Sequence, residues 1–166
     1  MSDLPGQTTS AGAPPGQQPS HQPPVAQHTG NGPSGPRAGF WQRFAALILD
    51  GLVLAVPSII VVVAVGSGGL ANLITTLIGI AYYVYFEGGP TGQTLGKKAL
   101  GIRVYDFRGG GGPIGYGRAF VRYLVRIVSS IPLFLGYFWM LWDKEKQTWQ
   151  DKAAGSVVVP TDAYPV

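Results

Sequence analysis

The sequence predicts an all-α membrane protein with a transmembrane helical hairpin, a third helical region and a disordered N-terminal tail. Three observations support this fold class. The 166 residues are 46% hydrophobic and only 12% charged, which is about half the charged share of a soluble domain. Two long apolar runs follow one another across a short glycine-rich turn. The segment before them is rich in proline and almost free of large apolar side chains.

Residues 1–36 form the predicted tail. They hold eight of the 14 prolines and no aromatic, Lys or Arg residue, so they cannot bury enough apolar surface to offset the entropy of ordering. His21 and His28 are isolated here and the chain has no cysteine, so we expect no metal and no cofactor. The first apolar run begins only at Phe44, too late for a cleaved secretory signal, and we therefore expect an uncleaved membrane anchor.

Residues 44–65 and 70–86 are the two predicted spans. The first has 22 residues with one charge, and as a helix it would measure about 33 Å, enough for a hydrocarbon core of about 30 Å. The second has 17 residues with no charge, the lower limit for a span. Aromatic residues before the first run and at the end of the second suit one lipid–water interface. The two runs therefore predict a hairpin.

Residues 120–142 form a third apolar region, whose place in the membrane stays open. Arg118, Arg122 and Arg126 recur every four residues and form a basic stripe on one helix face. This pattern is typical of an interfacial helix whose arginines contact anionic lipid headgroups. A short third span and a re-entrant segment are the alternatives. The basic residues before the first span and in residues 87–118 predict a cytoplasmic N-terminus in the plasma membrane, with the side of the C-terminus left open.

The membrane domain is expected to cover residues 37–159, followed by a C-terminal tail at 160–166. Within it, residues 99–107 alternate like a strand, and residues 157–159 could pair with them. Residues 92–98 resemble a phosphate loop superficially, but the glycine spacing and the final Lys98 depart from that motif. No nucleophile or metal-ligand constellation is visible, so we expect neither an enzyme nor a nucleic-acid-binding protein.

Asp50 is the most informative single residue, because a carboxylate inside a span is costly and needs a partner. Arg43 lies seven positions earlier, nearly two helical turns, and so shares its face. Two interpretations stay open: a carboxylate that binds a proton or cation in a transport path, or a structural ion pair or hydrogen bond. A stripe of small and polar residues on the second span is expected to pack on this face: Asn72, Thr76, Gly79 and Tyr83.

Three blocks of the sequence resemble the RDD family of membrane proteins. Residues 39–50 match the family's arginine and first aspartate at Arg43 and Asp50, and residues 92–106 resemble its central block. In residues 143–159 Asp151 stands at the place of the second aspartate, with Gln150 where the family often has His. The resemblance implies a bacterial or archaeal integral membrane domain. It also implies a mostly uncharacterised activity, for which transport and, in some members, sodium/proton exchange have been suggested.

Two functions are compatible with these features. The first is transport of a proton, cation or small solute that uses Asp50. Two spans cannot enclose a pathway, so this function needs a homo-oligomer or a partner membrane subunit. The second is a membrane adaptor or assembly subunit, in which Arg43, Asp50 and Asp151 are structural and the tail recruits partners. The expected surroundings in both cases are the lipid bilayer and its anionic headgroups.

Overall fold

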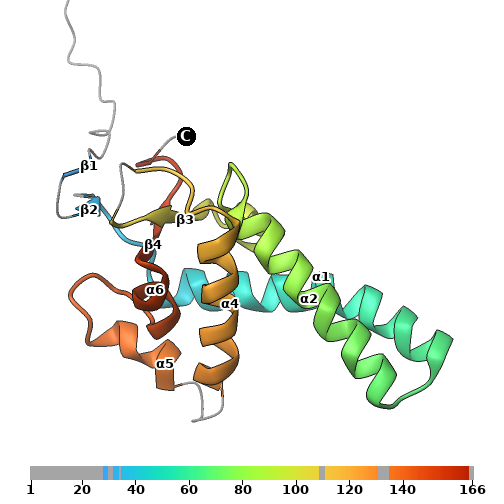
Figure 1. Cartoon of the computed structure of the whole chain (residues 1–166). Helices are drawn as coiled ribbons and strands as arrows, with labels where there is room; N and C mark the ends of the chain where they lie inside the picture. The colour runs from blue at the N-terminus through green and yellow to red at the C-terminus, as the bar shows by residue number, and fades with distance from the viewer. Residues whose placement is uncertain (1–27, 30–31, 34, 109–110, 131–134, 165–166) are drawn as a thin grey trace, which may run out of the picture.

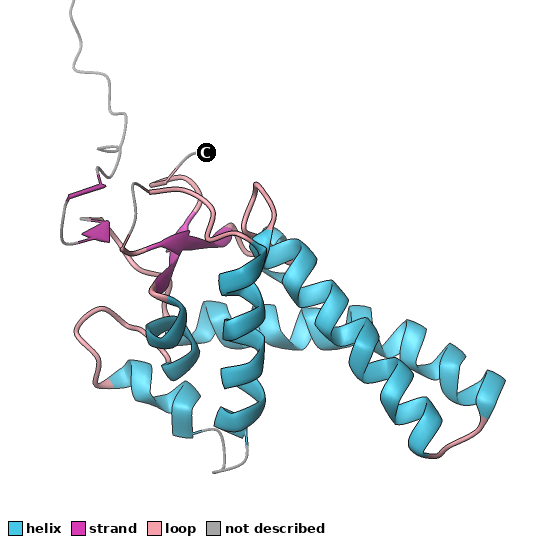
Figure 2. Cartoon of the chain, viewed as in Figure 1, coloured by secondary structure: helices cyan, strands magenta, loops and turns pink. Residues whose placement is uncertain are grey.

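A helical hairpin projects from a compact base in the computed structural model, which describes residues 28–29, 32–33, 35–108, 111–130 and 135–164 (Figure 1). Helix α1 (Phe40–Val65) and helix α2 (Gly69–Gly88) are joined by a short turn. Both are long and apolar enough to cross a membrane, and little of either is buried within the protein. The predicted spans lie inside these two helices, and the all-α membrane class is confirmed (Figure 2).

The base of the hairpin is built from short elements that follow α2. Its helices are α3 (Leu95–Ala99), α4 (Tyr116–Ser130), α5 (Leu135–Phe138), the 3-10 helix η1 (Trp139–Leu141) and α6 (Trp149–Ala154). Strands β3 (Ile102–Asp106) and β4 (Ser156–Pro160) pair antiparallel, with Ile102 opposite Pro160 and Asp106 opposite Ser156. This pair is the β element that the alternation predicted. Before α1, β1 (His28–Thr29) and β2 (Gly32–Pro33) form a second short pair.

The β3–β4 pair provides the core of the base. One of its faces packs Ile102, Val104 and Val158 against Ala46 of α1 and Ala119 of α4. Small residues at these helix positions allow the strands to approach the helices closely. The strand pair is therefore attached directly to the start of the hairpin.

The other face of the strand pair is covered by Tyr164, which is 1% exposed. The hydroxyl oxygen of Tyr164 accepts a hydrogen bond of 2.6 Å from the backbone N–H of Gly35. Residues 160–164 are therefore packed on the fold, in contrast to the predicted C-terminal tail. Of the tail predicted to be disordered, residues 1–36, the structure describes 28–29, 32–33 and 35–36, which include β1, β2 and the bonded Gly35. The rest of the tail lies outside the described residues.

The third apolar region does not form one long helix in the part of the chain that the structure describes. Helix α4 has 15 residues, so it is about 22 Å long, shorter than a hydrocarbon core of about 30 Å. Residues 131–134 lie outside the described part, and α5 and η1 after them are short. The described residues thus contain two candidate spans, α1 and α2.

Candidate functional site

A buried ionic network joins the base to both helices of the hairpin, and Arg122 of α4 lies at its centre. Arg122 is 2% exposed. Its Nε donates to Oε2 of Glu87, at the end of α2, over 2.9 Å. Its Nη1 donates to Oδ1 of Asp151 in α6 and, over 2.5 Å, to the hydroxyl of Ser156 in β4. One guanidinium therefore connects α2, α6 and β4.

Asp151 uses its second carboxylate oxygen to hold the start of α1. Nη1 of Arg43 donates to Oδ2 of Asp151 over 2.5 Å, and Nη2 of Arg43 donates to the carbonyl of Lys146 over 2.8 Å. Thr148 caps α6, and its backbone N–H donates to Oδ2 of Asp151 over 3.0 Å. This capping box fixes the carboxylate where both arginines reach it.

Glu87 extends the network to α3. Its Oε1 accepts a hydrogen bond from Nζ of Lys97, and both side chains are buried. Burial lowers the pKa of Lys97, and the charge of Glu87 opposes that shift. The network runs Arg43, Asp151, Arg122, Glu87, Lys97, so that cations and carboxylates alternate. Buried charges are tolerated only with such pairing.

Asp151 should make the stability of the protein sensitive to acid. Burial alone would raise the pKa of Asp151, but the charges of Arg122 and Arg43 hold it well below its ordinary value. The unfolded chain then binds more protons than the folded one as the pH falls below about 5, so stability present at neutral pH is lost toward pH 3. We expect the melting temperature in detergent to drop over this range.

The control for this pH effect is Asp143→Asn. Asp143 forms a peripheral pair with Lys152, whose side chain is 45% exposed. The acid-induced drop should persist in this variant. A melting temperature that stays flat down to pH 3 in the wild type, or a drop that disappears in Asp143→Asn, would contradict the assignment to Asp151.

Asp50 lies outside this network, in a cradle of neutral donors. It is 1% exposed. Its Oδ1 accepts hydrogen bonds from the hydroxyl of Tyr82 and the backbone N–H of Gly96, and its Oδ2 accepts one from the hydroxyl of Thr94, each of 2.7 Å. The sequence left a structural ion pair or a hydrogen bond open for Asp50, and the structure has the hydrogen bonds. Arg43 instead reaches back to Asp151, while α3 packs on α1 and brings donors to Asp50.

The cradle comes from residues 92–98, the segment that superficially resembles a phosphate loop. Thr94 caps α3 and accepts a hydrogen bond from the backbone N–H of Lys97. A Cβ on Gly96 would overlap the carbonyl oxygen of Ala46 and lie 2.8 Å from Oδ1 of Asp50. The segment therefore binds a carboxylate of its own chain, and glycine is needed for the close approach.

Thr94→Val should destabilise the protein measurably. The change keeps the shape of the side chain but removes the hydroxyl that caps α3 and donates to Asp50. We expect a loss of about 1–3 kcal/mol in unfolding free energy, read as a lower melting temperature in detergent. Thr91→Val, at an exposed threonine three residues earlier, is the matched control. Equal melting temperatures for the two variants would argue against the cradle.

The arginines of the α4 stripe bond to groups of the base, which differs from the expected contact with lipid headgroups. Arg122 is buried, whereas the side chain of Arg118 is 35% exposed. Arg118 donates to the carboxylate of Asp106 over 2.7 Å and to the carbonyls of Ala154 and Gly155. The guanidinium of Arg126 donates to the hydroxyl of Tyr137 and lies over the ring of Tyr83 at 4.1 Å. The other stripe residue, Arg122, is the centre of the network described above. Acceptors on α2, α5, α6, β3 and β4 and the carbonyl of Gly155 provide these partners, so lipid is not needed to satisfy the charges.

The polar stripe of α2 also faces a different neighbour from the one expected. Gly79 and Tyr83 lie against Tyr123 of α4, with the two tyrosine rings 5.9 Å apart, and Asn72 is exposed. The α2 residue that contacts Asp50 is instead Tyr82, the neighbour of Tyr83 in the sequence, which lies on a different face of the helix. The reason is that α4 packs along α2 and takes the face that was assigned to α1.

Sequence reasoning did not assign a role to Glu87 or Lys97. Glu87 follows directly on the predicted second span, and the chain has only eight acidic residues. An acid at that position was a usable signal, because an ionisable group next to a span needs a partner. Lys97 is one of the basic residues of 87–118, whose pattern indicates only the orientation in the membrane.

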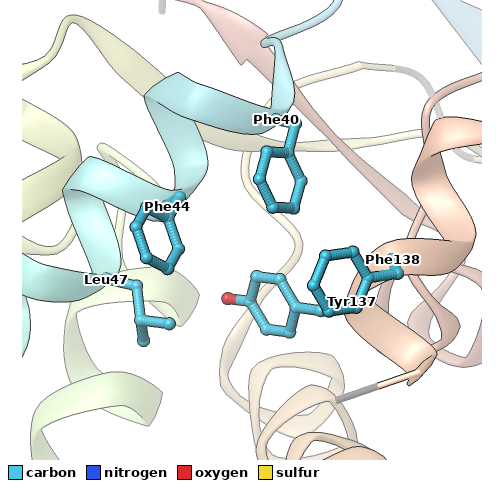
Figure 3. Close-up of a pocket in the computed structure, with 5 residues that line it drawn as sticks. All are labelled: Phe40, Phe44, Leu47, Tyr137 and Phe138. Atoms are coloured by element: carbon cyan, nitrogen blue, oxygen red, sulfur yellow. The ribbon is translucent and has the colours of Figure 1, made fainter. Parts of the chain in front are cut away.

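An apolar pocket of about 150 Å³ lies beside the first turns of α1 (Figure 3). Its lining residues are Phe40, Phe44, Leu47, Tyr137 and Phe138, and the aromatic rings from α1 and α5 face one another across it. None of the charged residues of the network contributes to this lining.

The sequence profile of the RDD family matches residues 37–155, from just before α1 to the end of α6. The chain belongs to the RDD family. The match contains Arg43, Asp50 and Asp151, which the resemblance singled out. In this RDD protein Arg43 and Asp151 form one ion pair, and Asp50 is held separately.

Curated relatives include two mycobacterial proteins and one from a bacillus. The chain is 35% identical over 96 residues to a proline-rich antigen homolog of Mycobacterium tuberculosis, covering 56% of this chain and 40% of that protein. It is 35% identical over 98 residues to the proline-rich antigen of Mycobacterium leprae, covering 57% and 39%. The match to the uncharacterised protein YxaI of Bacillus subtilis is 27% over 135 residues, covering 66% and 88%.

The matched region thus spans about two fifths of the length of each mycobacterial relative. No solved structure matches the chain.

Proposed function

We propose that this RDD protein is a membrane adaptor or assembly subunit, in which the Arg/Asp set is structural. The observation that carries the proposal is the closed network around Arg122. Every carboxylate in it has two cationic partners within the protein: Asp151 contacts Arg43 and Arg122, and Glu87 contacts Arg122 and Lys97. Such a network fixes the hairpin to the base and makes the base a rigid platform at the membrane surface.

The proposed location is a bacterial plasma membrane, crossed twice, with the base and the N-terminus on the cytoplasmic side. Exposed basic side chains of the base, such as Lys98 and Arg108, support this orientation, because positively charged segments next to spans favour the cytoplasm. The proposed role requires neither catalysis nor nucleic-acid binding.

The proline-rich tail is the proposed recruiting segment. Near its end, the backbone N–H of Gly35 donates to the hydroxyl of Tyr164 in the base, so a partner bound to the tail is held close to the membrane. The Pro-Pro pairs at residues 14–15 and 23–24 favour polyproline II, a conformation that partner domains recognise with little ordering cost.

Cross-linking in the membranes of the producing organism tests the adaptor proposal. The full chain and a variant lacking residues 1–36 are cross-linked in parallel and purified. A variant with both Pro-Pro pairs changed to Ala keeps the tail length and serves as the matched control. We expect a defined partner with the full chain, its loss on deletion and its weakening in the alanine variant. Recovery of the same partners with and without the tail would overturn the proposal.

A second candidate function is transport of a proton, cation or small solute by an oligomer or with a partner membrane subunit. It is favoured by Asp50, which is fully buried in an apolar helix and is bonded to neutral donors only, among the described residues. Vesicles reconstituted with the wild type and with Asp50→Asn are tested for ion-driven pH change. Flux that is lost in Asp50→Asn, with the melting temperature preserved, would replace the adaptor proposal. No flux with the wild type would exclude transport of the ions tested.

A further inference from the structure

Helix α4 is amphipathic with its charged face turned inwards. Its three arginines bond to groups of the base, so the opposite face is left on the outside. The exposed apolar side chains of this outer face of α4 are Tyr116, Phe120, Val121, Leu124, Ile127 and Val128, each at least 40% exposed. Soluble proteins rarely expose a contiguous apolar patch of this kind, and such a patch marks a surface that contacts a protein partner or a membrane.

The outer face of α4 continues the exposed surface of the hairpin. The ring of Tyr116 stacks on that of Tyr85 in α2, with centroids 6.5 Å apart, and Tyr85 is 65% exposed. A Cβ on Gly88 would lie 2.7 Å from the backbone of Tyr116, so the backbones of α2 and α4 touch here. Figure 1 shows α4 beside the end of α2, across the base of the hairpin. The two exposed faces are one surface.

Exposed tryptophans mark the level of this surface relative to the bilayer. Trp41, in the first turn of α1, is 75% exposed, and Trp142, just after η1, is 77% exposed. Their segments are joined by the stacked rings of Phe40 and Phe138, 5.6 Å apart. Exposed tryptophans are enriched at lipid–water interfaces. We therefore expect the start of α1 and the elements that follow α4 to lie at such an interface.

We propose that α4 is an in-plane interfacial helix whose outer face contacts lipid acyl chains at the base of the hairpin. Its arginines face away from the lipid, opposite to the usual arrangement in which cations on such a helix bind headgroups. Lipid is the chosen occupant because the face carries no charge and continues into the hairpin surface, which the bilayer covers in any case. A second copy of the chain is the competing occupant. The inference does not depend on the adaptor function.

The absence of cysteine from the chain makes a single-cysteine test possible. Leu124→Cys and Val128→Cys place an environment-sensitive fluorophore on the outer face of α4. Val63→Cys, at an 80% exposed site of α1, is the lipid control, and Lys98→Cys, at an exposed site of α3, is the water control. Each labelled protein is reconstituted into vesicles of phosphatidylcholine and phosphatidylglycerol, with and without bromine on the acyl chains.

Quenching by brominated chains distinguishes the outcomes. We expect the probes at positions 124 and 128 to be quenched about as strongly as the one at 63, while the one at 98 is not. Before labelling, the thiols at 124 and 128 should react with a water-soluble maleimide much more slowly than the thiol at 98. Quenching and reactivity like those at position 98 would overturn the proposal. So would efficient disulfide formation between copies through Val128→Cys at high dilution in lipid, because a second copy would then cover the face.

Discussion

Asp151→Asn is expected to cause the largest loss of stability of any single substitution in the ionic network. The change preserves shape but removes the carboxylate shared by Arg43 and Arg122, which are 5% and 2% exposed. Neither guanidinium can release its proton. Arg43 then has no carboxylate partner in the network, and Arg122 must share Glu87 with Lys97. Removing one partner from a buried ion pair costs about 3–5 kcal/mol. We expect little folded protein in the membrane fraction.

Because cations and carboxylates alternate in the network, we also expect removal of the central arginine to cost less than removal of Asp151. Arg122→Met removes the central residue but leaves two balanced pairs, Arg43 with Asp151 and Glu87 with Lys97. This variant should therefore be more stable than Asp151→Asn, although it loses more hydrogen bonds. For the same reason, adding Arg43→Gln to Asp151→Asn should recover part of the loss, because one uncompensated cation is removed.

Thermal unfolding in detergent, followed by the fraction of monodisperse protein, measures these differences. Asp143→Asn is the matched control, since it makes the same chemical change at a carboxylate whose cationic partner, Lys152, is 45% exposed. Its loss leaves an exposed lysine rather than a buried arginine without its partner, so it should cost less than Asp151→Asn. If Asp151→Asn melts like Asp143→Asn, the network does not hold the hairpin to the base. If Arg122→Met is the less stable of the two network variants, hydrogen bonding rather than charge balance dominates.

The hairpin and the strand pair could be predicted because they depend on local pattern. Run length and the scarcity of charge define α1 and α2, and alternation defines β3. The pair between Arg43 and Asp151 joins residues 108 positions apart, and no spacing argument connects them; the family resemblance named both but not their contact. Asp50 shows the same limit. One of its donors is Tyr82 of α2, and the other two, Thr94 and Gly96, come from the N-cap and first turn of α3, a five-residue helix too short to give a periodic signal.

For α4 the sequence pattern predicts the arginine face of the helix correctly but predicts the surroundings of that face wrongly. The four-residue spacing of the arginines does place them on one face, as predicted. Periodicity does not say whether that face meets water, headgroups or buried acids, and the acids here come from distant segments: Glu87, Asp106 and Asp151. Glu87, directly after the second predicted span, is the one of these acids whose position in the sequence indicates a need for a cationic partner. Because the arginines pair with these acids inside the base, the opposite, apolar face of α4 is left outside.

Gly96→Ala is the second substitution for which we expect a large effect, because α3 approaches α1 most closely there. The added methyl would overlap the carbonyl oxygen of Ala46 and lie 2.8 Å from the carboxylate of Asp50. Helix α3 would have to move away, which lengthens the hydrogen bonds from Gly96 and Thr94 to Asp50 and leaves a buried carboxylate poorly satisfied. Overpacking of this kind costs about 1–3 kcal/mol, and the weakened hydrogen bonds add to it.

Gly51→Ala is the matched control for this substitution. Gly51 is the neighbour of Asp50 in α1, and a Cβ there meets no other atom within 4 Å. Because alanine favours a helix over glycine by about 1 kcal/mol, Gly51→Ala should melt at or above the temperature of the wild type. Gly96→Ala should melt several degrees lower. Equal melting temperatures would mean that α3 is not seated on Asp50, and the carboxylate would then be open to the proton or cation that a transport function requires.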